Sequence, residues 1–178
     1  MKVELPSDKF LQPGPAGVVV LATCVDEEDE PNIITLGMYM PISINPPMVC
    51  IGVAPQRYSH DLIKSSGEFV INTPPIQIED EMHFCGVKSG RDVDKFQETG
   101  LTPIPSKVLS PPRIRECFGH LECRVIQEHT CGDHTLFVGE VIAASANKEV
   151  LDEGLLNPLK AQPIIQKNHV YYTVTKEK

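Results

Sequence analysis

Prolines recur along this chain and limit the length of any helix. The 178 residues include 16 prolines, among them the pairs Pro46–Pro47 and Pro74–Pro75. A proline inside a helix removes a backbone hydrogen bond and clashes with the preceding turn. We therefore expect short helices, and strands that supply most of the framework.

Apolar, β-branched runs bounded by turn residues indicate where the strands lie. They predict strands over residues 17–25, 33–45, 48–54, 68–72, 118–130, 134–146 and 170–175. The triplet "CGD" between the two longest runs can form a hairpin turn. This order predicts a mainly β fold with a few short α-helices, in which a largely antiparallel sheet closes into a small barrel.

Three short helices are expected at the edge of this sheet. In the first, Ser59 is the expected N-cap and Gly67 the stop. The second covers residues 74–86 and starts with two prolines, which the first helical turn tolerates. The third covers residues 92–100, and a Pro- and Ser-rich connector follows over residues 101–114.

Charge and composition exclude several classes of function. The formal net charge of −8 argues against general nucleic-acid binding, which needs a broad basic surface. No apolar run approaches the roughly 20 residues that span a bilayer, and the first residues lack a signal-peptide core. We therefore expect a cytoplasmic protein with no nucleic-acid or membrane partner, folded as one domain over residues 1–178. Six irregularly spaced cysteines do not indicate a disulfide framework.

A cluster of hydrogen-bond donors stands out in this acidic chain. Arg57, Tyr58, Ser59 and His60 lie where the strand over residues 48–54 passes into the first predicted helix. A helix N-terminus offers free N–H groups and a partial positive charge, and both stabilise a phosphate. The pattern is equally compatible with Ser59 as a simple cap and Arg57 as a surface charge, while Asp61 could partly cancel the field.

A second group of residues has spacings similar to those of zinc ligands. It comprises Cys117, His120, Cys123, Cys131 and His134. On a strand, Cys117 and Cys123 would share one face and His120 would point to the other. We therefore expect no metal site here.

Three stretches in order, Met38–Val49, Ala54–His60 and Gly67–Asn72, resemble the flavin reductase-like family. The sequences "DKF" and "GDHTLFVGEV" fit the same family in the same order. Together with "GHLEC" and "EGLL", they are closest to the flavoredoxin-like branch. The resemblance covers roughly residues 10–172.

This resemblance implies an FMN-binding split β-barrel and a homodimer that holds FMN in a groove at the subunit interface. The segment Leu36–Ile42 would run along the isoalloxazine ring, and Ala54–His60 would hold the ribityl phosphate. Residues around Cys85 and Lys95 would close over the flavin. The implied cofactor-binding residues are Leu36, Gly37, Met38, Tyr39, Met40, Pro41, Ile42, Ala54, Gln56, Arg57, Ser59, His60, Phe84, Cys85, Gly86, Lys95 and Phe96.

The resemblance also implies a catalytic role for His134. In the family, the histidine of this "GDH" motif lies near the place where a nicotinamide stacks on the flavin, so His134 would position the nicotinamide or modulate charge. The alternative is a turn histidine whose ring bonds a backbone carbonyl. The chain departs from many reductases of the family at Gly37–Pro41, which carries few side-chain hydroxyls.

The implied function is an NAD(P)H-dependent flavin reductase-type oxidoreductase, in which hydride passes from nicotinamide C4 to flavin N5. The alternative is a flavoredoxin-like electron-transfer flavoprotein that takes electrons from a redox partner protein. A third interpretation is a binding protein that keeps the fold without catalysis. No sequence fingerprint selects NADH over NADPH as the reductant.

Overall fold

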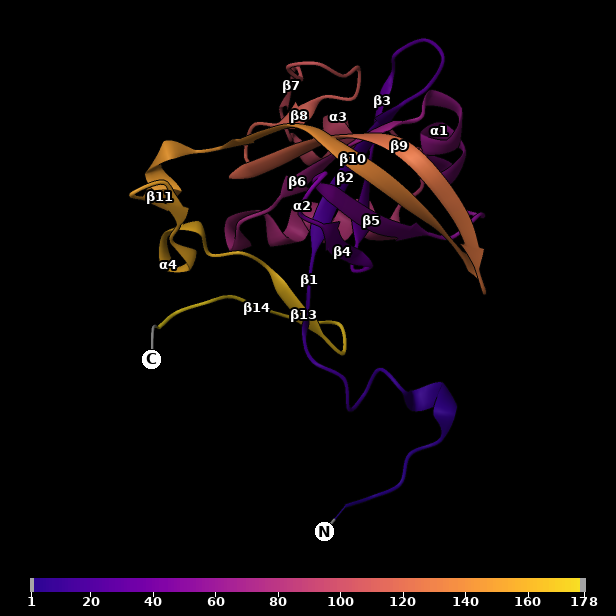
Figure 1. The fold of residues 1–178 in the computed structure, drawn as a ribbon, viewed down its shortest axis with the longest axis vertical. Helices are drawn as coiled ribbons and strands as arrows, with labels where there is room; N and C mark the ends of the chain where they lie inside the picture. The colour runs from indigo at the N-terminus through magenta and orange to yellow at the C-terminus, as the bar shows by residue number, and fades with distance from the viewer. Residues whose placement is uncertain (1, 177–178) are drawn as a thin grey trace.

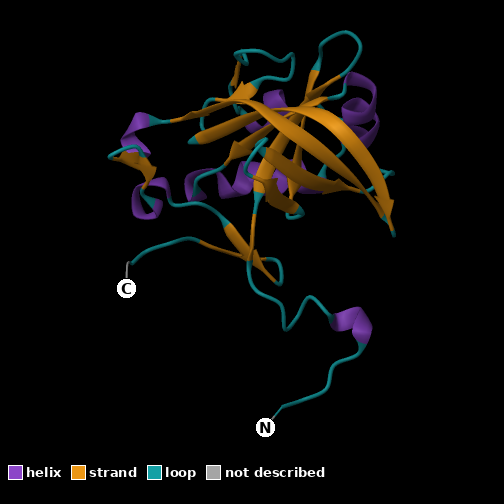
Figure 2. Ribbon diagram, in the orientation of Figure 1, coloured by secondary structure: helices purple, strands orange, loops and turns teal. Residues whose placement is uncertain are grey.

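Seven antiparallel strands form one curved sheet, which is the framework of the structure (Figures 1 and 2). The computed structural model describes residues 2–176, so residues 1, 177 and 178 of the predicted domain lie outside it. Along the sheet the strands follow the order β3-β2-β6-β9-β10-β5-β4. Their bounds are β2 Val20–Val25, β3 Pro31–Leu36, β4 Tyr39–Ser43, β5 Met48–Val53, β6 Glu68–Thr73, β9 Gly119–Cys131 and β10 His134–Ala146.

The predicted mainly β, largely antiparallel fold is confirmed, but the predicted closure of the sheet is wrong. The run over residues 33–45 is not one strand, because the chain breaks at Gly37 and Met38. On one side of this break β3 pairs with β2, and on the other side β4 pairs with β5. The two strands therefore end up at opposite edges of the sheet, and no ladder joins them in the described part of the chain. Pro41 suits this position, since an edge strand can spare a backbone N–H.

The hairpin of β9 and β10 agrees with the prediction. Gly132 and Asp133 connect the two strands, and Gly132 adopts a φ of 61°, which favours glycine. Smaller sheets flank the large one. They are formed by β1 Gly17–Val18 with β13 Ile165–Lys167 and β14 Val170–Tyr172, by β7 Pro103–Ile104 with β8 Arg113–Ile114, and by β11 Leu151–Asp152 with β12 Leu155–Leu156. Of their strands the sequence indicated β14, within the predicted run 170–175, and β1, at the start of the predicted run 17–25.

The helices are short, as the prolines predict. They are α1 Tyr58–Ser66, α2 Glu79–Val87, α3 Lys95–Thr99 and α4 Pro158–Ala161, with the 3-10 turns η1 Ser7–Lys9, η2 Ile76–Ile78 and η3 Lys148–Val150. Gly67 ends α1 in the left-handed conformation, as expected. Ser59 is not the N-cap, because α1 already begins at Tyr58 and Arg57 takes the cap position, two residues earlier than predicted. Within residues 2–176, no helix is long and apolar enough to cross a membrane.

Two apolar clusters pack on opposite sides of β2, whose six residues are all buried. Alternation along the strand sends Ala22 into the cluster that contains α1, and Leu21 into the cluster that contains α2 and α3. The second cluster includes Met82 and Phe96, so α2 and α3 lie against β3. Three helices thus converge around the adjacent strands β2 and β3.

Gly139 in β10 provides a test of the packing in the first cluster. A Cβ at this position would lie 2.5 Å from Cζ of Phe69 and 2.9 Å from Cβ of Cys123. We expect Gly139→Ala to lower the free energy of unfolding by about 1–3 kcal/mol through overpacking, measured by urea denaturation. Gly17→Ala, where a Cβ would meet nothing within 4 Å, should change it by less than about 0.5 kcal/mol. Equal effects of the two substitutions would contradict the described packing.

Candidate functional site

A small pocket lies at the beginning of α1 and gathers residues from distant parts of the sequence. Its volume is about 100 Å³, and its walls come from β3, the β5–α1 turn, the end of α2 and the start of α3. Six of the predicted cofactor-binding residues line it: Gln56, Arg57, Ser59, Cys85, Gly86 and Lys95. The structure thus brings together three segments that are spread between residues 34 and 95 of the sequence.

The pocket is basic, although the chain is acidic. Arg57, Lys88 and Lys95 line it, and none of the described side chains in its wall is acidic. Arg57 is exposed at the N-cap position of α1, where the helix dipole adds to its charge. This arrangement favours an anion, because the charges and the helix N-terminus are positive. The volume of about 100 Å³ has room for a group as small as a phosphate.

Lys95 is a buried cation at the centre of this arrangement. Its side chain donates hydrogen bonds to the carbonyl oxygens of Ile33, at 2.7 Å, and Cys85, at 2.8 Å. Burial lowers the pKa of Lys95, and no carboxylate lies within ion-pair distance of it in the described part of the chain. An ammonium has three donors, so one N–H remains for a further acceptor. An anion in the pocket would offset the cost of burying this charge.

Ser59 is buried and takes part in a hydrogen-bond network rather than capping the helix. Its Oγ accepts a hydrogen bond of 2.7 Å from Nδ2 of Asn32, on β3. A hydroxyl can donate as well as accept, and the Cys24 sulfur and a ligand in the pocket are the two acceptors within its reach. Cys24 lies on the far side of Asn32, and burial raises the pKa of its thiol to about 11.

His60 is held by partners on both sides of its ring. Nε2 lies 2.9 Å from Oγ1 of Thr135, and Nδ1 lies 3.2 Å from Oδ1 of Asp61. The ring also packs edge-on against Phe137, with centroids 5.3 Å apart. The His60 side chain does not line the pocket, so any contribution to anion binding would come through the placement of α1.

Arg91 lies outside the pocket lining but supports its wall, and sequence reasoning missed it. Its guanidinium donates to Oδ2 of Asp61 at 2.9 Å and to the carbonyl of Gln56 at 3.2 Å, and it stacks over the ring of Tyr58. These bonds hold the segment that contains Lys88, Ser89 and Gly90 against α1. They also neutralise Asp61, the acid that could have weakened an anion site. No sequence signal could identify Arg91, since its partners lie 30 and 35 residues away.

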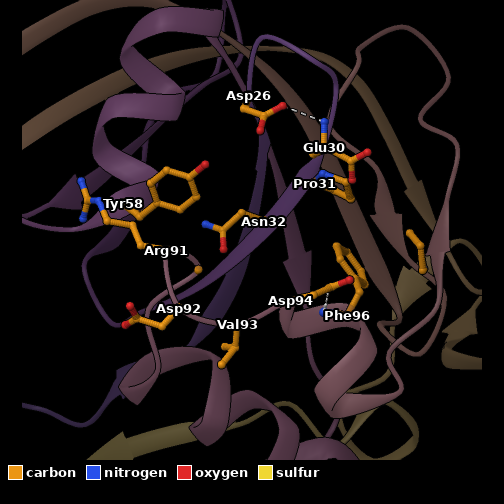
Figure 3. Close-up of a pocket in the computed structure, with 12 residues that line it drawn as sticks. Asp26, Glu30, Pro31, Asn32, Tyr58, Arg91, Asp92, Val93, Asp94 and Phe96 are labelled. Atoms are coloured by element: carbon orange, nitrogen blue, oxygen red, sulfur yellow. Dashed lines mark hydrogen bonds between the residues drawn. The ribbon is translucent and has the colours of Figure 1, made fainter.

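A second and larger cavity, of about 500 Å³, adjoins the basic pocket (Figure 3). Tyr58 and Gly90 line both. Phe96, one of the predicted cofactor-binding residues, lines the larger cavity and not the basic pocket. Its wall also contains one basic residue, Arg91, and four acidic ones, Asp26, Glu30, Asp92 and Asp94, so the two neighbouring cavities differ in charge.

The segment predicted to contact the flavin ring forms the end of β3, the break after it and the edge strand β4. Leu36 is buried, and the backbone carbonyl of Met38 accepts a hydrogen bond of 3.0 Å from the N–H of Gly52. Four apolar side chains along this segment are exposed: Met38 just before β4 by 51%, Met40 and Ile42 on β4 by 58% and 40%, and Ile44 just after it by 89%. The remaining predicted residues here are Gly37, Pro41 and the half-buried Tyr39.

His134 opens β10 at the tip of the long hairpin. Its Nδ1 lies 2.8 Å from Oδ1 of Asp133, so the ring bonds a carboxylate and not a backbone carbonyl. Its neighbour Thr135 pairs with Val53 and contacts His60, which ties this end of the hairpin to the β5–α1 turn. His134 lines neither of the two cavities.

Two further predicted residues also line neither cavity. Ala54 lies between β5 and α1, and Phe84 lies on α2.

The cysteines and histidines with zinc-like spacing are dispersed. Cys117 packs in the second apolar cluster and Cys123 in the first, so the prediction that they share one face is wrong. The reason is that β9 begins at Gly119, and Cys117 lies in the preceding turn. Among residues 2–176, no three His, Cys, Asp or Glu side chains form a metal-binding group. Cys85 is buried in the second cluster, and burial raises the pKa of its thiol to about 11.

Solved structures of flavin proteins have the same fold. The flavoredoxin of Methanosarcina acetivorans superposes with a TM-score of 0.90 at 27% identity, over 100% of this chain and 94% of that one. The flavoredoxin of Desulfovibrio vulgaris superposes with a TM-score of 0.92 at 25% identity, over 100% and 96%. An FMN-binding protein of Thermus thermophilus gives a TM-score of 0.83 at 25% identity, over 100% and 97%. A split-barrel flavin reductase fold is also among the neighbours, which confirms the predicted split barrel.

Sequence comparison leads to the same family. A protein of Archaeoglobus fulgidus is 40% identical over 114 residues, which make up 64% of this chain and 64% of that protein's own length. An NADH-dependent FAD reductase of Streptomyces globisporus is 28% identical over 132 residues, 74% of this chain and 70% of the reductase. The family model described as "Flavin reductase like domain" matches residues 14–173. The chain therefore belongs to the flavin reductase-like family.

Proposed function

We propose that this protein binds FMN and works as an NAD(P)H-dependent oxidoreductase of the flavin reductase type. The observation that carries the proposal is the basic pocket at the start of α1. It contains three cationic side chains, a buried serine hydroxyl and a helix N-terminus, all of which suit a phosphate. Membership of the family and the FMN-binding neighbour support flavin as the rest of the ligand.

The residues present fit the phosphate of FMN. Arg57, at the rim of the pocket, can donate two parallel hydrogen bonds to the phosphate. Lys95, in the interior, has one N–H left to donate to it. Arg91 and Asp61 hold the wall that carries Lys88 in place. When bound, FMN would supply a two-electron acceptor for hydride from a reduced nicotinamide. The protein would bind and orient the reactants and exclude water, which lowers the entropic part of the barrier.

A homodimer with the flavin at its interface is part of this proposal. The exposed apolar row from Met38 to Ile44 consists of Met40 and Ile42 on the edge strand β4, which has unpaired backbone groups, and of one residue on either side of that strand. Such an edge is prone to uncontrolled association unless a specific partner covers it. A second copy would cover the row, and the same segment would then face the flavin ring in the interface.

A specific observation favours a second candidate function, an electron-transfer flavoprotein that receives electrons from a partner protein. The flavoredoxins superpose over the whole chain with TM-scores of 0.90 and 0.92. In that case FMN would stay bound permanently, and no nicotinamide would be needed. A cytoplasmic location suits both functions and is supported by six cysteines that are all free thiols.

An anaerobic titration separates the two candidates. If the reductase proposal holds, the purified protein binds FMN, and mixing with NADH or NADPH bleaches its flavin absorbance without added partners. Bleaching only by a ferredoxin-like donor would favour the electron carrier. Lack of FMN binding would refute both.

Removal of Arg57 tests the phosphate assignment. We expect Arg57→Ala to weaken FMN by about 1–3 kcal/mol, because a charge-assisted hydrogen bond is lost. Riboflavin, which has no phosphate, should bind both forms equally well in fluorescence titrations. Lys64→Ala removes an exposed cation from the other end of α1, where it pairs with Glu128, and serves as the matched control. An equal loss of FMN affinity in both variants would show that Arg57 acts only through net charge.

Removal of His134 tests its role in hydride transfer. We expect His134→Ala to slow flavin reduction by roughly 10- to 100-fold in anaerobic stopped-flow experiments, since misplacement of reactants is costly. FMN affinity should stay unchanged. His129→Ala is the matched control, because His129 is exposed on the same hairpin and its side chain hydrogen-bonds to Gln127 of its own strand. Loss of FMN without slower reduction would assign His134 a structural role instead.

A further inference from the structure

We propose that Arg91 is a positioning residue that sets how long FMN stays bound, because it fastens a movable wall of the phosphate pocket to the start of α1. The wall consists of residues 88–93, which we name the strap. This inference rests on the proposed binding of FMN. The residence time of FMN separates the two candidate functions, since an electron carrier keeps its FMN whereas a reductase of free flavin releases it.

The strap connects two anchored elements but is itself loosely attached. Cys85 of α2 and Lys95 of α3 are buried on either side of it, whereas none of residues 88–93 is buried. Within the strap, two backbone N–H groups donate to the carbonyl of Ser89. A segment with few buried contacts and mostly internal hydrogen bonds opens at a low cost in free energy.

Arg91 is the clasp that holds the strap against the rest of the protein. In the described part of the chain, it makes every hydrogen bond that links the strap to elements other than α2. Its guanidinium donates to Oδ2 of Asp61 at 2.9 Å and to the carbonyl of Gln56 at 3.2 Å. Figure 3 shows Arg91 beside the ring of Tyr58, with 5.1 Å between its Cζ and the ring centroid. One side chain therefore holds the strap closed.

Gly90 allows the strap to lie close to β3 and α1. A Cβ on Gly90 would overlap the side-chain amide of Asn32 and would lie 3.0 Å from Cδ1 of Tyr58. No side chain fits in so little space, so any other residue here would lift the strap. Because Gly90 precedes Arg91, lifting it would draw the guanidinium away from Asp61.

Opening of the strap would remove one wall of the phosphate pocket. Lys88, Ser89 and Gly90 line this pocket, so the charge of Lys88 and the polar groups beside it would leave the phosphate when the strap swings out. The clasp restrains the bound state, and it should therefore act on the release of FMN more than on its capture.

The first test measures FMN release and association by stopped-flow flavin fluorescence in Arg91→Ala and Gly90→Ala. We expect release to become about tenfold faster in both variants, while the association rate changes by less than about threefold. Riboflavin, which lacks the phosphate, should leave both variants at about the wild-type rate. Lys64→Ala removes an exposed cation that pairs with Glu128 at the other end of α1, and it should leave FMN release unchanged.

Asp61→Ala separates the clasp from a purely electrostatic effect, because the two explanations predict opposite signs. If Arg91 works as a clasp, the loss of Asp61 also speeds FMN release. If only charge matters, the loss of a carboxylate near the phosphate slows release. Asp92→Ala is the matched control, since it removes an exposed acid of the strap whose side chain makes no hydrogen bond among the described residues. FMN release from this control should stay within about twofold of the wild-type rate.

Wild-type release rates in Arg91→Ala, or slower release from Asp61→Ala, would overturn the strap and leave the flavin function intact. Riboflavin release that accelerates as much as FMN release would also overturn it, because the effect would then not lie at the phosphate. Both variants replace exposed side chains, so they decide the test even if Gly90→Ala fails to fold. Failure of the wild-type protein to bind FMN or riboflavin would instead overturn the proposed function.

Discussion

The buried ammonium of Lys95 is the interaction on which the candidate site depends. It binds one carbonyl of β3 and one of α2 from its position at the start of α3, so a single side chain joins three elements. A charge in this position costs free energy unless several polar groups compensate it. The two carbonyls supply part of that compensation, and an anion in the pocket would supply the remainder. The ammonium of Lys95 would therefore both hold α3 against β3 and α2 and bind the anion.

Local sequence signals identified the elements around the site, but not how the strands pair at the two edges of the sheet. The apolar runs that become β2, β5 and β6, and Gly67 at the end of α1, could be recognised from composition and turn chemistry. The edges of the sheet could not, because β3 and β4 read as one continuous run. Strand pairing is decided by long-range packing, and no local pattern encodes it.

In the candidate site, too, local patterns predicted some residues and missed those that depend on tertiary contacts. The donor cluster from Arg57 to His60 was visible as a helix-end anion site, and family resemblance added Cys85, Gly86 and Lys95. The role of Ser59 was different from the predicted cap, because its partner Asn32 comes from another strand. Lys88, Gly90 and Arg91 were missed, since their contribution depends on a loop that folds back over α1. Residues that act through tertiary contacts carry no local signature.

The burial of the cysteines has a consequence for the chemical durability of the protein. Burial raises the pKa of Cys123 to about 12 and moves those of Cys50 and Cys117 in the same direction, as it does for Cys24 and Cys85. Peroxides attack thiolates and not thiols. The neutral, enclosed sulfurs of the core are therefore resistant to oxidative damage, and Cys131, exposed at the hairpin tip, is the one thiol open to it.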